Sequence, residues 1–184
     1  MACYVTSGSV SLDGRYISKL STQDRISEGL AFVPQTKNVF PSMTVEENIQ
    51  MGGFIRKDDI SKTIEEVYEL FHILYEKRKQ LAEQLSGGQR QQVAFGRAMM
   101  TRPSVMLLDE PTAGVSPIVM DEIFSNILDV RNAGMAVLMV EQNAQQALNI
   151  ADKGFVLVSG RNEHTGSGKE LINDPEVRKK FLGG

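Results

Sequence analysis

The 184-residue chain has very little cysteine, no tryptophan and no long apolar run. Cys3 is its single cysteine, so no disulfide can form within the chain, and a reducing compartment fits this usage. The first thirty residues contain no apolar segment of signal-peptide length, and the longest apolar runs, such as 135–140, are far too short to span a bilayer. We therefore expect any role at a membrane to be peripheral.

An excess of charge of one sign is also missing. The chain has 20 Lys and Arg residues against 23 Asp and Glu residues, a net charge of −3, so no basic field attracts a polyanion and we expect no nucleic-acid partner. A hydrophobic content of 41% and a charged content of 23% are typical of globular proteins. The length predicts one domain over 1–184 with a single core, and no internal repeat divides it.

A glycine-rich helix start lies at Ser86-Gly87-Gly88-Gln89. Ser86 and Gln89 have the spacing of a capping box, and the two glycines leave backbone N–H groups uncovered. Free N–H groups at the positive end of a helix dipole form an anion site. By itself this spacing is also that of an ordinary capped helix.

A strand ending in paired carboxylates follows closely. Residues 105–108 form a continuous apolar run, which predicts a strand of a parallel sheet buried on both faces. Asp109 and Glu110 come at its carboxyl end, where open α/β sheets bind ligands, and Pro111 helps to end the strand. One carboxylate can hold Mg²⁺ while its neighbour accepts a proton from an attacking water.

The order of LSGGQ, VMLLDEPT and a serine-containing turn resembles the ATP-binding subunits of ABC transporters, in which these are the signature motif, Walker B and the D-loop. Joint occurrence at this spacing is far more specific than either motif alone. Four segments further resemble the LivF-type ATPases of branched-chain amino acid importers: VFPSMTVEENIQMGG (39–53), TAGVSP (112–117), VEQNAQQALNIAD (140–152) and the tail INDPEVRKKFLGG. The resemblance extends from about Ser7 to the last residue.

The resemblance implies an α/β fold of the P-loop NTPase type, with a mainly parallel sheet flanked by helices. Residues 1–38 and 101–184 would form the α/β core, and residues 39–100 a mainly helical signature subdomain that docks on the cytoplasmic loops of a membrane subunit. Periodicity places strands at 30–33, 135–140 and 155–158 and a strand and turn around Asp13-Gly14. It predicts helices over 21–27, from 45, and over 61–84, 89–100 and 144–152, with another from Ser116-Pro117 to near Gly134.

The resemblance also assigns roles to single residues around ATP and Mg²⁺. Asp109 would support Mg²⁺, and Gln35, placed directly after a strand, would reach Mg²⁺ or the attacking water. Glu110 would be the general base. The signature residues Ser86, Gly87, Gly88 and Gln89 would clamp the γ-phosphate of ATP held by a second subunit.

The usual family pattern has a histidine at the position of Gln142. In having a glutamine there, this chain resembles the LivF-type branch. A glutamine can donate a hydrogen bond to the γ-phosphate but cannot titrate, which excludes a mechanism based on a protonated histidine. Glu110 is left as the preferred base, with Gln142 as its catalytic neighbour.

The chain contains no G-x-x-x-x-G-K-[ST] loop. Gly166-Ser167-Gly168-Lys169 imitates one, but Glu163 and Glu170 stand where the loop needs Gly and Ser or Thr. Measured against the family, the fold is therefore expected to be N-terminally incomplete, through a start site placed too late, a truncated chain or a true loss. Without the strand that leads into that loop, we expect unpaired sheet edges.

We expect the complete protein to be the ATP-hydrolysing subunit of an importer of branched-chain amino acids, while this chain is not competent alone. It would lie in the cytoplasm on the inner face of the cell membrane. Its partners would be a second ATPase subunit, identical or not, the transmembrane permease and, indirectly, a solute-binding protein. The alternatives are a non-catalytic interaction remnant and the ATPase of a urea, amide or lipopolysaccharide ABC system.

Overall fold

The computed structural model describes residues 7–181, so Cys3 and the last three residues of the tail lie outside the described part. The strands are β1 (Ser11–Leu12), β2 (Arg15–Tyr16), β3 (Leu30–Val33), β4 (Val105–Asp109), β5 (Ala136–Val140), β6 (Gly154–Val158) and β7 (Arg161–Gly166). The helices are α1 (Thr22–Ser27), α2 (Val45–Gly52), α3 (Ser61–Leu70), α4 (His72–Glu76), α5 (Gly87–Met99), α6 (Pro117–Asn132), α7 (Ala144–Ile150), α8 (Gly168–Asn173) and α9 (Pro175–Phe181), with a 3₁₀ turn η1 (Ala82–Gln84).

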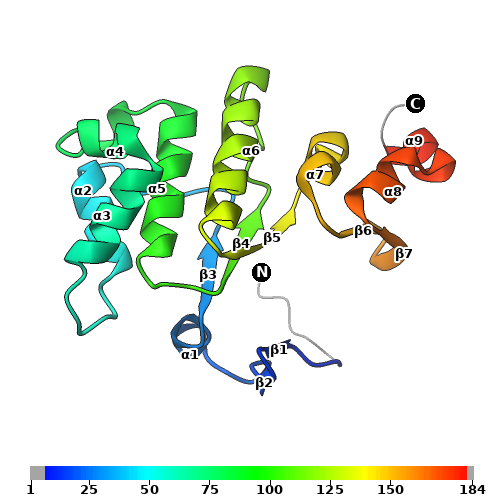
Figure 1. Ribbon diagram of the computed structural model, residues 1–184, viewed down its shortest axis with the longest axis horizontal. Helices are drawn as coiled ribbons and strands as arrows, with labels where there is room; N and C mark the ends of the chain where they lie inside the picture. The colour runs from blue at the N-terminus through cyan, green and yellow to red at the C-terminus, as the bar shows by residue number, and fades with distance from the viewer. Residues whose placement is uncertain (1–6, 182–184) are drawn as a thin grey trace.

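A three-stranded parallel sheet in the order β3-β4-β5 lies at the centre of the molecule (Figure 1). Leu30 pairs with Val105 and Val105 with Ala136, so the three strands run in register and end at the same edge. The helices of the intervening segments make the crossovers that parallel strands require. The α/β architecture expected from the sequence is confirmed.

One face of this sheet is covered and the other is open. Met106 and Leu108 of β4 point into the core formed with α5 and α6. On the opposite face Phe32 and Leu138 are each 58% exposed and Val140 is 61% exposed. The prediction that residues 105–108 are buried on both faces is therefore wrong, because in β4 Met106 and Leu108 are buried whereas Val105 and Leu107, on the opposite face, are only partly buried.

Within residues 7–181 the parallel sheet does not extend beyond β5. In the described part of the chain β5 pairs only with β4, while β6 and β7 form a separate antiparallel hairpin (Figure 1). The edges of β5 and β6 thus carry unpaired backbone groups, in agreement with the expectation of open edges.

The helical region, with α2, α3 and α4 on the left of Figure 1, begins at α2 and ends with α5. The continuous helix predicted over 61–84 is wrong: α3 ends at Leu70, and Phe71, with φ −124° and ψ 72°, breaks the helix before the short α4. Phe71 at the break and Leu74 after it are both buried in the core. Tertiary burial therefore overrides a helical periodicity that continues through the break.

Two glycines allow the helices to pack closely. A Cβ on Gly52 would lie 2.0 Å from the carbonyl oxygen of Arg97, which brings α2 against the backbone of α5. A Cβ on Gly96 would lie 2.7 Å from a methyl group of Val67 in α3. These contacts fix α5 against α2 and α3.

The structure of the C-terminal region explains the segment Gly166-Ser167-Gly168-Lys169, which imitates a phosphate loop in sequence. Gly166 ends β7, Ser167 caps α8 in a capping box with Glu170, and a Cβ on Gly168 would lie 2.0 Å from the carbonyl oxygen of Leu148. The segment is thus a packed helix start, preceded by an exposed hairpin strand that periodicity did not predict. Among the helices of residues 7–181, none combines the length and the apolar character needed to cross a bilayer.

Candidate functional site

Three side chains from separate parts of the chain meet at the carboxyl ends of the parallel strands. Gln35 follows β3, Glu110 follows β4 directly, and Gln142 follows β5. Because parallel strands in register end at one edge, residues far apart in sequence become neighbours there. Two of them, Gln35 and Glu110, are 75 positions apart in the chain.

The two glutamines hold the one carboxylate between them. The amide Nε2 of Gln35 donates a hydrogen bond to Oε2 of Glu110 over 2.9 Å, and Nε2 of Gln142 donates to Oε1 over 2.8 Å. A carboxylate offers about four lone-pair positions, so each oxygen retains one for a further donor. The Glu110 carboxylate is thus oriented while each of its oxygens can still accept another hydrogen bond.

The backbone of Glu110 is in the left-handed region, with φ +45°. For a residue with a side chain this conformation costs about 1–2 kcal/mol. It is held by the N–H of Glu110, which donates to the carbonyl of Val140 over 2.9 Å. Strain of this kind collects at functional sites, where the surroundings enforce one orientation of a side chain.

These three side chains line a cleft of about 400 Å³. Its other lining residues come from the turns after β4 and β5 and from the first turns of α6: Thr112, Ala113, Gly114, Val115, Met120, Glu141 and Asn143. The cleft is polar on the sheet side and open to solvent, so a phosphate and a water molecule can reach Glu110. It brings together Gln35, Glu110 and Gln142.

A second polar network, which sequence reasoning missed, ties the turn after β4 to the turn after β5. The Glu141 carboxylate accepts hydrogen bonds from the backbone N–H groups of Thr112, Gln142 and Asn143 at 3.0–3.3 Å. Nδ2 of Asn143 also donates to the hydroxyl of the buried Thr112 over 2.9 Å. Polar residues directly after a parallel strand were the available signal, but their partners depend on the neighbouring strand.

Asp109 is not part of the cleft lining. As the last residue of β4 it lies on the open face of the sheet, in register with Val140, and is exposed. Its carboxylate has no hydrogen-bond or ion-pair partner within residues 7–181. Gln35 uses its amide nitrogen on Glu110 and keeps its carbonyl oxygen available. Both oxygens are hard donors of the kind that Mg²⁺ takes, although the described residues contain no cluster of three acidic, His or Cys ligands.

The signature residues form the expected helix start. Ser86 Oγ accepts from the backbone N–H of Gln89 over 3.2 Å, and Oε1 of Gln89 accepts from the N–H of Ser86 over 3.1 Å. A Cβ on Gly87 would have no neighbouring atom of the described residues within 4 Å, whereas a Cβ on Gly88 would lie 2.8 Å from a carboxylate oxygen of Glu122 in α6. None of these four residues lines the cleft at Glu110. The structure therefore separates the signature from the Glu110 cluster within one chain.

Comparison with known proteins shows the family to which the chain belongs. The family model described as "ABC transporter" matches residues 2–113, more than half of the chain. The high-affinity branched-chain amino acid transport ATP-binding protein BraG of Pseudomonas aeruginosa is 42% identical, over 97% of this chain and 77% of that protein. The lipopolysaccharide export system ATP-binding protein LptB of Haemophilus influenzae is 34% identical, over 96% of this chain and 74% of that protein.

The fold is likewise shared with solved structures. The ADP conformation of MJ1267, an ATP-binding cassette of an ABC transporter, aligns with a TM-score of 0.84 at 27% identity, over 97% of this chain and 78% of that one. A nucleotide-free ATP-binding cassette from an ABC transporter aligns with a TM-score of 0.82 at 26% identity, over 99% of this chain and 79% of that one. The chain thus belongs to the ABC transporter family of ATP-binding subunits, whose members hydrolyse ATP.

Proposed function

We propose that this chain is part of the ATP-hydrolysing subunit that energises import of branched-chain amino acids. The observation that carries the proposal is the single carboxylate of Glu110 held by two amides at the ends of neighbouring parallel strands. The substrate class rests on the similarity to BraG and to the probable branched-chain amino acid transport ATP-binding protein LivF of Archaeoglobus fulgidus, at 42% and 39% identity.

In this proposal Glu110 is the general base. A water molecule that donates to one carboxylate oxygen is turned toward the γ-phosphate and loses its proton to Glu110 as its oxygen bonds to the γ-phosphorus. The bond from that phosphorus to the bridging oxygen breaks at the same time, and ADP leaves with the bonding electrons. Gln35 and Gln142 keep the carboxylate in place, and Gln142 can exchange its bond to Glu110 for one to a phosphate oxygen. Positioning a base contributes about 10²–10⁴ in rate.

Mg²⁺ fits the oxygen donors at this edge of the sheet. Asp109 and the carbonyl oxygen of Gln35 are the groups that would hold it, and the ion would neutralise phosphate charge. The remaining contacts to the nucleotide need a lysine-bearing phosphate loop, which the sequence of these 184 residues does not contain. The signature residues, separate from the cleft, would serve ATP bound to a second subunit, so the active unit is a dimer of such subunits.

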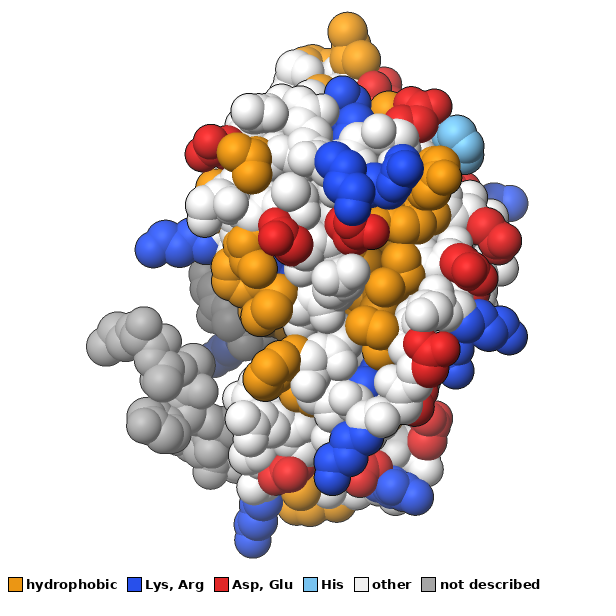
Figure 2. Space-filling view, turned by 90° about the vertical axis from the view of Figure 1, so that its left-hand side faces the viewer, with side chains coloured by type: hydrophobic (Ala, Val, Ile, Leu, Met, Phe, Trp, Pro, Cys, Tyr) orange, Lys and Arg blue, Asp and Glu red, His pale blue; other side chains and the backbone are white. Residues whose placement is uncertain are grey.

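The permease would dock on the helical region. Figure 2 views the molecule from the side of that region and shows hydrophobic side chains gathered among charged ones. The exposed large hydrophobic residues of this region are Phe40, Met51, Phe54, Ile55 and Tyr75, with Phe54 80% exposed. Exposed apolar surface of this kind, on α2, on α4 and in the turns around α2, favours a protein partner. Through the permease the chain would be held peripherally at the membrane.

Complementation of leucine uptake tests the proposal. The chain, preceded by a segment that supplies a G-x-x-x-x-G-K-[ST] loop, is expressed in cells that lack the ATPase subunit of a branched-chain amino acid importer, and uptake of labelled leucine is measured. We expect uptake to depend on Glu110, so that Glu110→Gln abolishes it, while the exposed change Glu163→Gln leaves it unaltered. Uptake by Glu110→Gln at the level of the unmodified chain would exclude Glu110 as the base.

Binding of labelled ATP to the chain separates the alternatives. If the chain supplied with the phosphate loop restores no uptake and binds no ATP with or without Mg²⁺, it is an interaction module and the enzymatic proposal fails. If it restores lipopolysaccharide export in cells depleted of that ATPase, but not leucine uptake, the substrate class is wrong and the ATPase function stands.

A further inference from the structure

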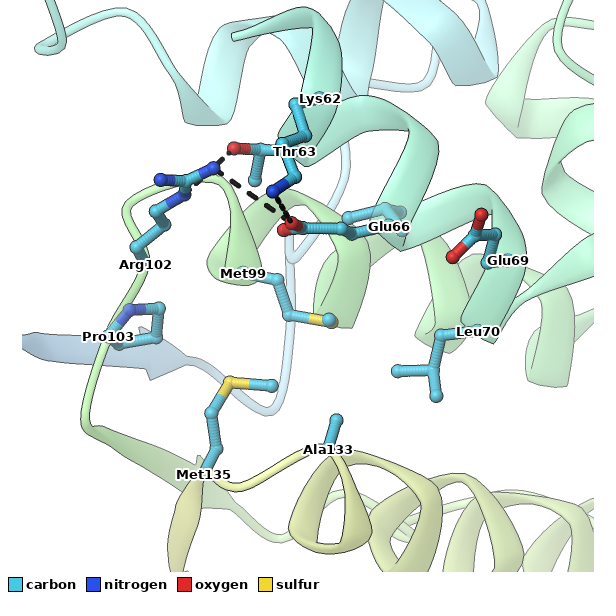
Figure 3. A pocket seen from close by; sticks show the side chains of 11 residues that line it. Lys62, Thr63, Glu66, Glu69, Leu70, Met99, Arg102, Pro103, Ala133 and Met135 are labelled. Carbon is cyan, nitrogen blue, oxygen red and sulfur yellow. Dashed lines mark hydrogen bonds and ion pairs between the residues drawn. The ribbon is translucent and has the colours of Figure 1, made fainter.

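A second cleft, of about 600 Å³, lies at the opposite end of the strands from Glu110 (Figure 3). Pro103 and Met135, which line it, precede β4 and β5, whereas Glu110 and Gln142 follow them. The cleft is closed on its other side by α3 of the helical region. Its size and its place between two parts of a fold are those of small-molecule sites.

The floor of this cleft is aliphatic. Met99, Met135, Leu70 and Pro103 line it together with Val67 and Ala133, and Figure 3 shows the two methionines and Leu70 converging on the same space. No aromatic ring is among the lining residues, so a nucleobase would find no stacking surface. Flexible methionine side chains adapt to a small branched aliphatic group.

The rim carries two charges of each sign. Lys62 and Arg102 are cationic, and Glu66 and Glu69 are anionic. Glu66 is 4.0 Å from both cations, at the outer limit of an ion pair, and Glu69 has no ion-pair or hydrogen-bond partner within residues 7–181. A ligand with a single charge would be repelled by the two rim residues of the same sign. A group carrying both charges close together is matched by the rim.

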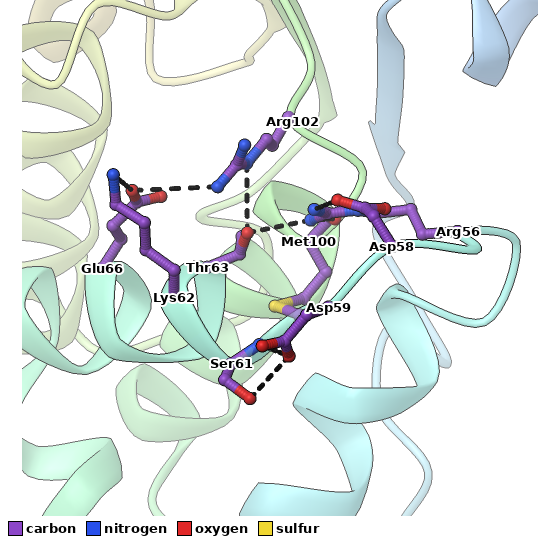
Figure 4. Close-up of polar contacts among 9 residues, drawn as sticks. All are labelled: Arg56, Asp58, Asp59, Ser61, Lys62, Thr63, Glu66, Met100 and Arg102. Atoms are coloured by element: carbon purple, nitrogen blue, oxygen red, sulfur yellow. Dashed lines mark hydrogen bonds and ion pairs between the residues drawn. The ribbon is translucent and has the colours of Figure 1, made fainter.

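Of the two cations at the rim, Arg102 is held by a partly buried hydrogen-bond network (Figure 4). Nε of Arg102 donates to the hydroxyl of Thr63 over 3.1 Å, and Thr63 also accepts from Arg56 over 2.8 Å. Arg56 donates in addition to the carbonyl of Met100 over 2.9 Å. Arg102 itself has a left-handed backbone, with φ +50°, a strained conformation of the kind found at ligand sites.

We propose that this cleft binds a free aliphatic α-amino acid as a zwitterion. Its carboxylate lies against Arg102 and Lys62, its ammonium group against Glu66 and Glu69, and its side chain against Met99, Met135 and Leu70. Because α3 belongs to the helical region and Met135 leads into β5 of the sheet, one ligand molecule contacts both parts and ties them together. That this ligand is the transported solute, acting on its own transporter, rests on the proposed function; the binding itself does not.

NMR of the intact chain labelled at the methionine methyl groups tests the proposal, with L-leucine as the probe. We expect the signals of Met99 and Met135 to shift and saturate, while Met43 and Met106 outside the cleft stay unchanged. Two analogues lack one charge each: 4-methylpentanoate has no ammonium group and 3-methylbutylamine has no carboxylate. Each should bind more weakly, by up to about fivefold, as expected for the loss of one exposed ion pair.

Glu69→Gln supplies the matched variant. It removes the unpaired carboxylate at the rim and should weaken L-leucine binding about fivefold, whereas Glu65→Gln, on the same helix outside the cleft, should have no effect. Unmoved Met99 and Met135 signals up to the solubility limit of leucine would overturn the proposal, as would binding of 4-methylpentanoate as tight as that of leucine. Neither result concerns Glu110. A failure of the leucine-binding test therefore leaves the proposed ATPase function untouched, and a failure of the leucine-uptake test leaves the proposed leucine binding untouched.

Discussion

Gln142 donates a 2.8 Å hydrogen bond to Oε1 of Glu110 across the ends of two neighbouring strands. A glutamine in this position orients the carboxylate without carrying a charge at any pH. The backbone of Glu110 is in the left-handed region, and its N–H donates to the carbonyl of Val140 at the end of β5. Both properties lead to measurable expectations.

The first prediction concerns the pH dependence of ATP hydrolysis by the assembled transporter. Since Gln142 does not titrate, Gln142→His should add a new limb to the rate profile near the ordinary histidine pKa of about 6.5, with activity changing between about pH 5.5 and 7.5. Gln142→Asn, which also does not titrate, is the control and should lower the rate without adding a limb. Superimposable profile shapes for the original and the histidine variant would contradict a direct contact with Glu110.

The second prediction concerns the strain at Glu110. Because glycine adopts φ +45° without penalty, Glu110→Gly should be more stable to unfolding than Glu110→Ala by about 1 kcal/mol. At Asp109, which has ordinary strand backbone, the order should reverse, with Gly less stable than Ala by about 0.5–1 kcal/mol. Urea unfolding of the four variants measures both differences, and the same order at the two positions would show that Glu110 is unstrained.

The third prediction concerns the crossing of α2 and α5. Gly52→Ala places a methyl group 2.0 Å from the carbonyl oxygen of Arg97, where only backbone movement can relieve the contact, so stability should fall by about 1–3 kcal/mol. Gly87→Ala, with nothing within 4 Å, should leave the stability unchanged or slightly raised. Equal midpoints for Gly52→Ala and the original chain in thermal unfolding would mean that the helices are not this close.

The fourth prediction concerns Asn48, a fully buried residue of α2. Its Oδ1 accepts from the N–H of Phe40, and its Nδ2 donates to the carbonyls of Phe40, Met43 and Thr44 at 2.9–3.2 Å. Asn48→Asp turns the donor into an acceptor facing three carbonyls.

Because these buried groups then lack a donor, the variant should lose at least about 2 kcal/mol of stability. The same amide-to-carboxylate change at the exposed Gln50 of α2 should cost little. Chemical denaturation at neutral pH compares the two. A small, equal effect at both positions would show that Asn48 does not organise the 40–44 turn.

The fifth prediction concerns stability in acid. The hydrogen bond from Arg56 lowers the pKa of Asp58 from 3.8 to about 2. A carboxyl group whose pKa is lower in the folded state adds stability that is fully present above its unfolded pKa and is lost as the pH falls through the folded value. This contribution should therefore disappear between about pH 4 and pH 2.

Asp58→Asn should accordingly flatten the fall of the thermal midpoint over that pH interval. Asp152→Asn, a change at an exposed aspartate with no partner in the described part of the chain, is the control and should leave the slope as it is. If Asp58→Asn and the original chain lose stability in parallel on acidification, the contact with Arg56 does not persist in solution.

Local sequence alone determined most of the elements and the family. Ser86 and Gln89 specify their helix start by spacing, the apolar run before Asp109 specifies β4, and the joint order of the two motifs identifies the ABC transporter family. These features depend on residues a few positions apart, so nothing distant is needed to recognise them.

Tertiary structure decided the rest, because it concerns contacts between distant segments. Whether a strand is buried on both faces depends on what packs over it, and Leu138 proved to be exposed. The break at Phe71 follows from burial of its side chain, which outweighs local helix propensity. Strand order and register set the hydrogen-bond partners of Gln35 and Glu141. They also place the Glu110 cleft at one end of the sheet and the second cleft, lined by Met99 and Met135, at the other.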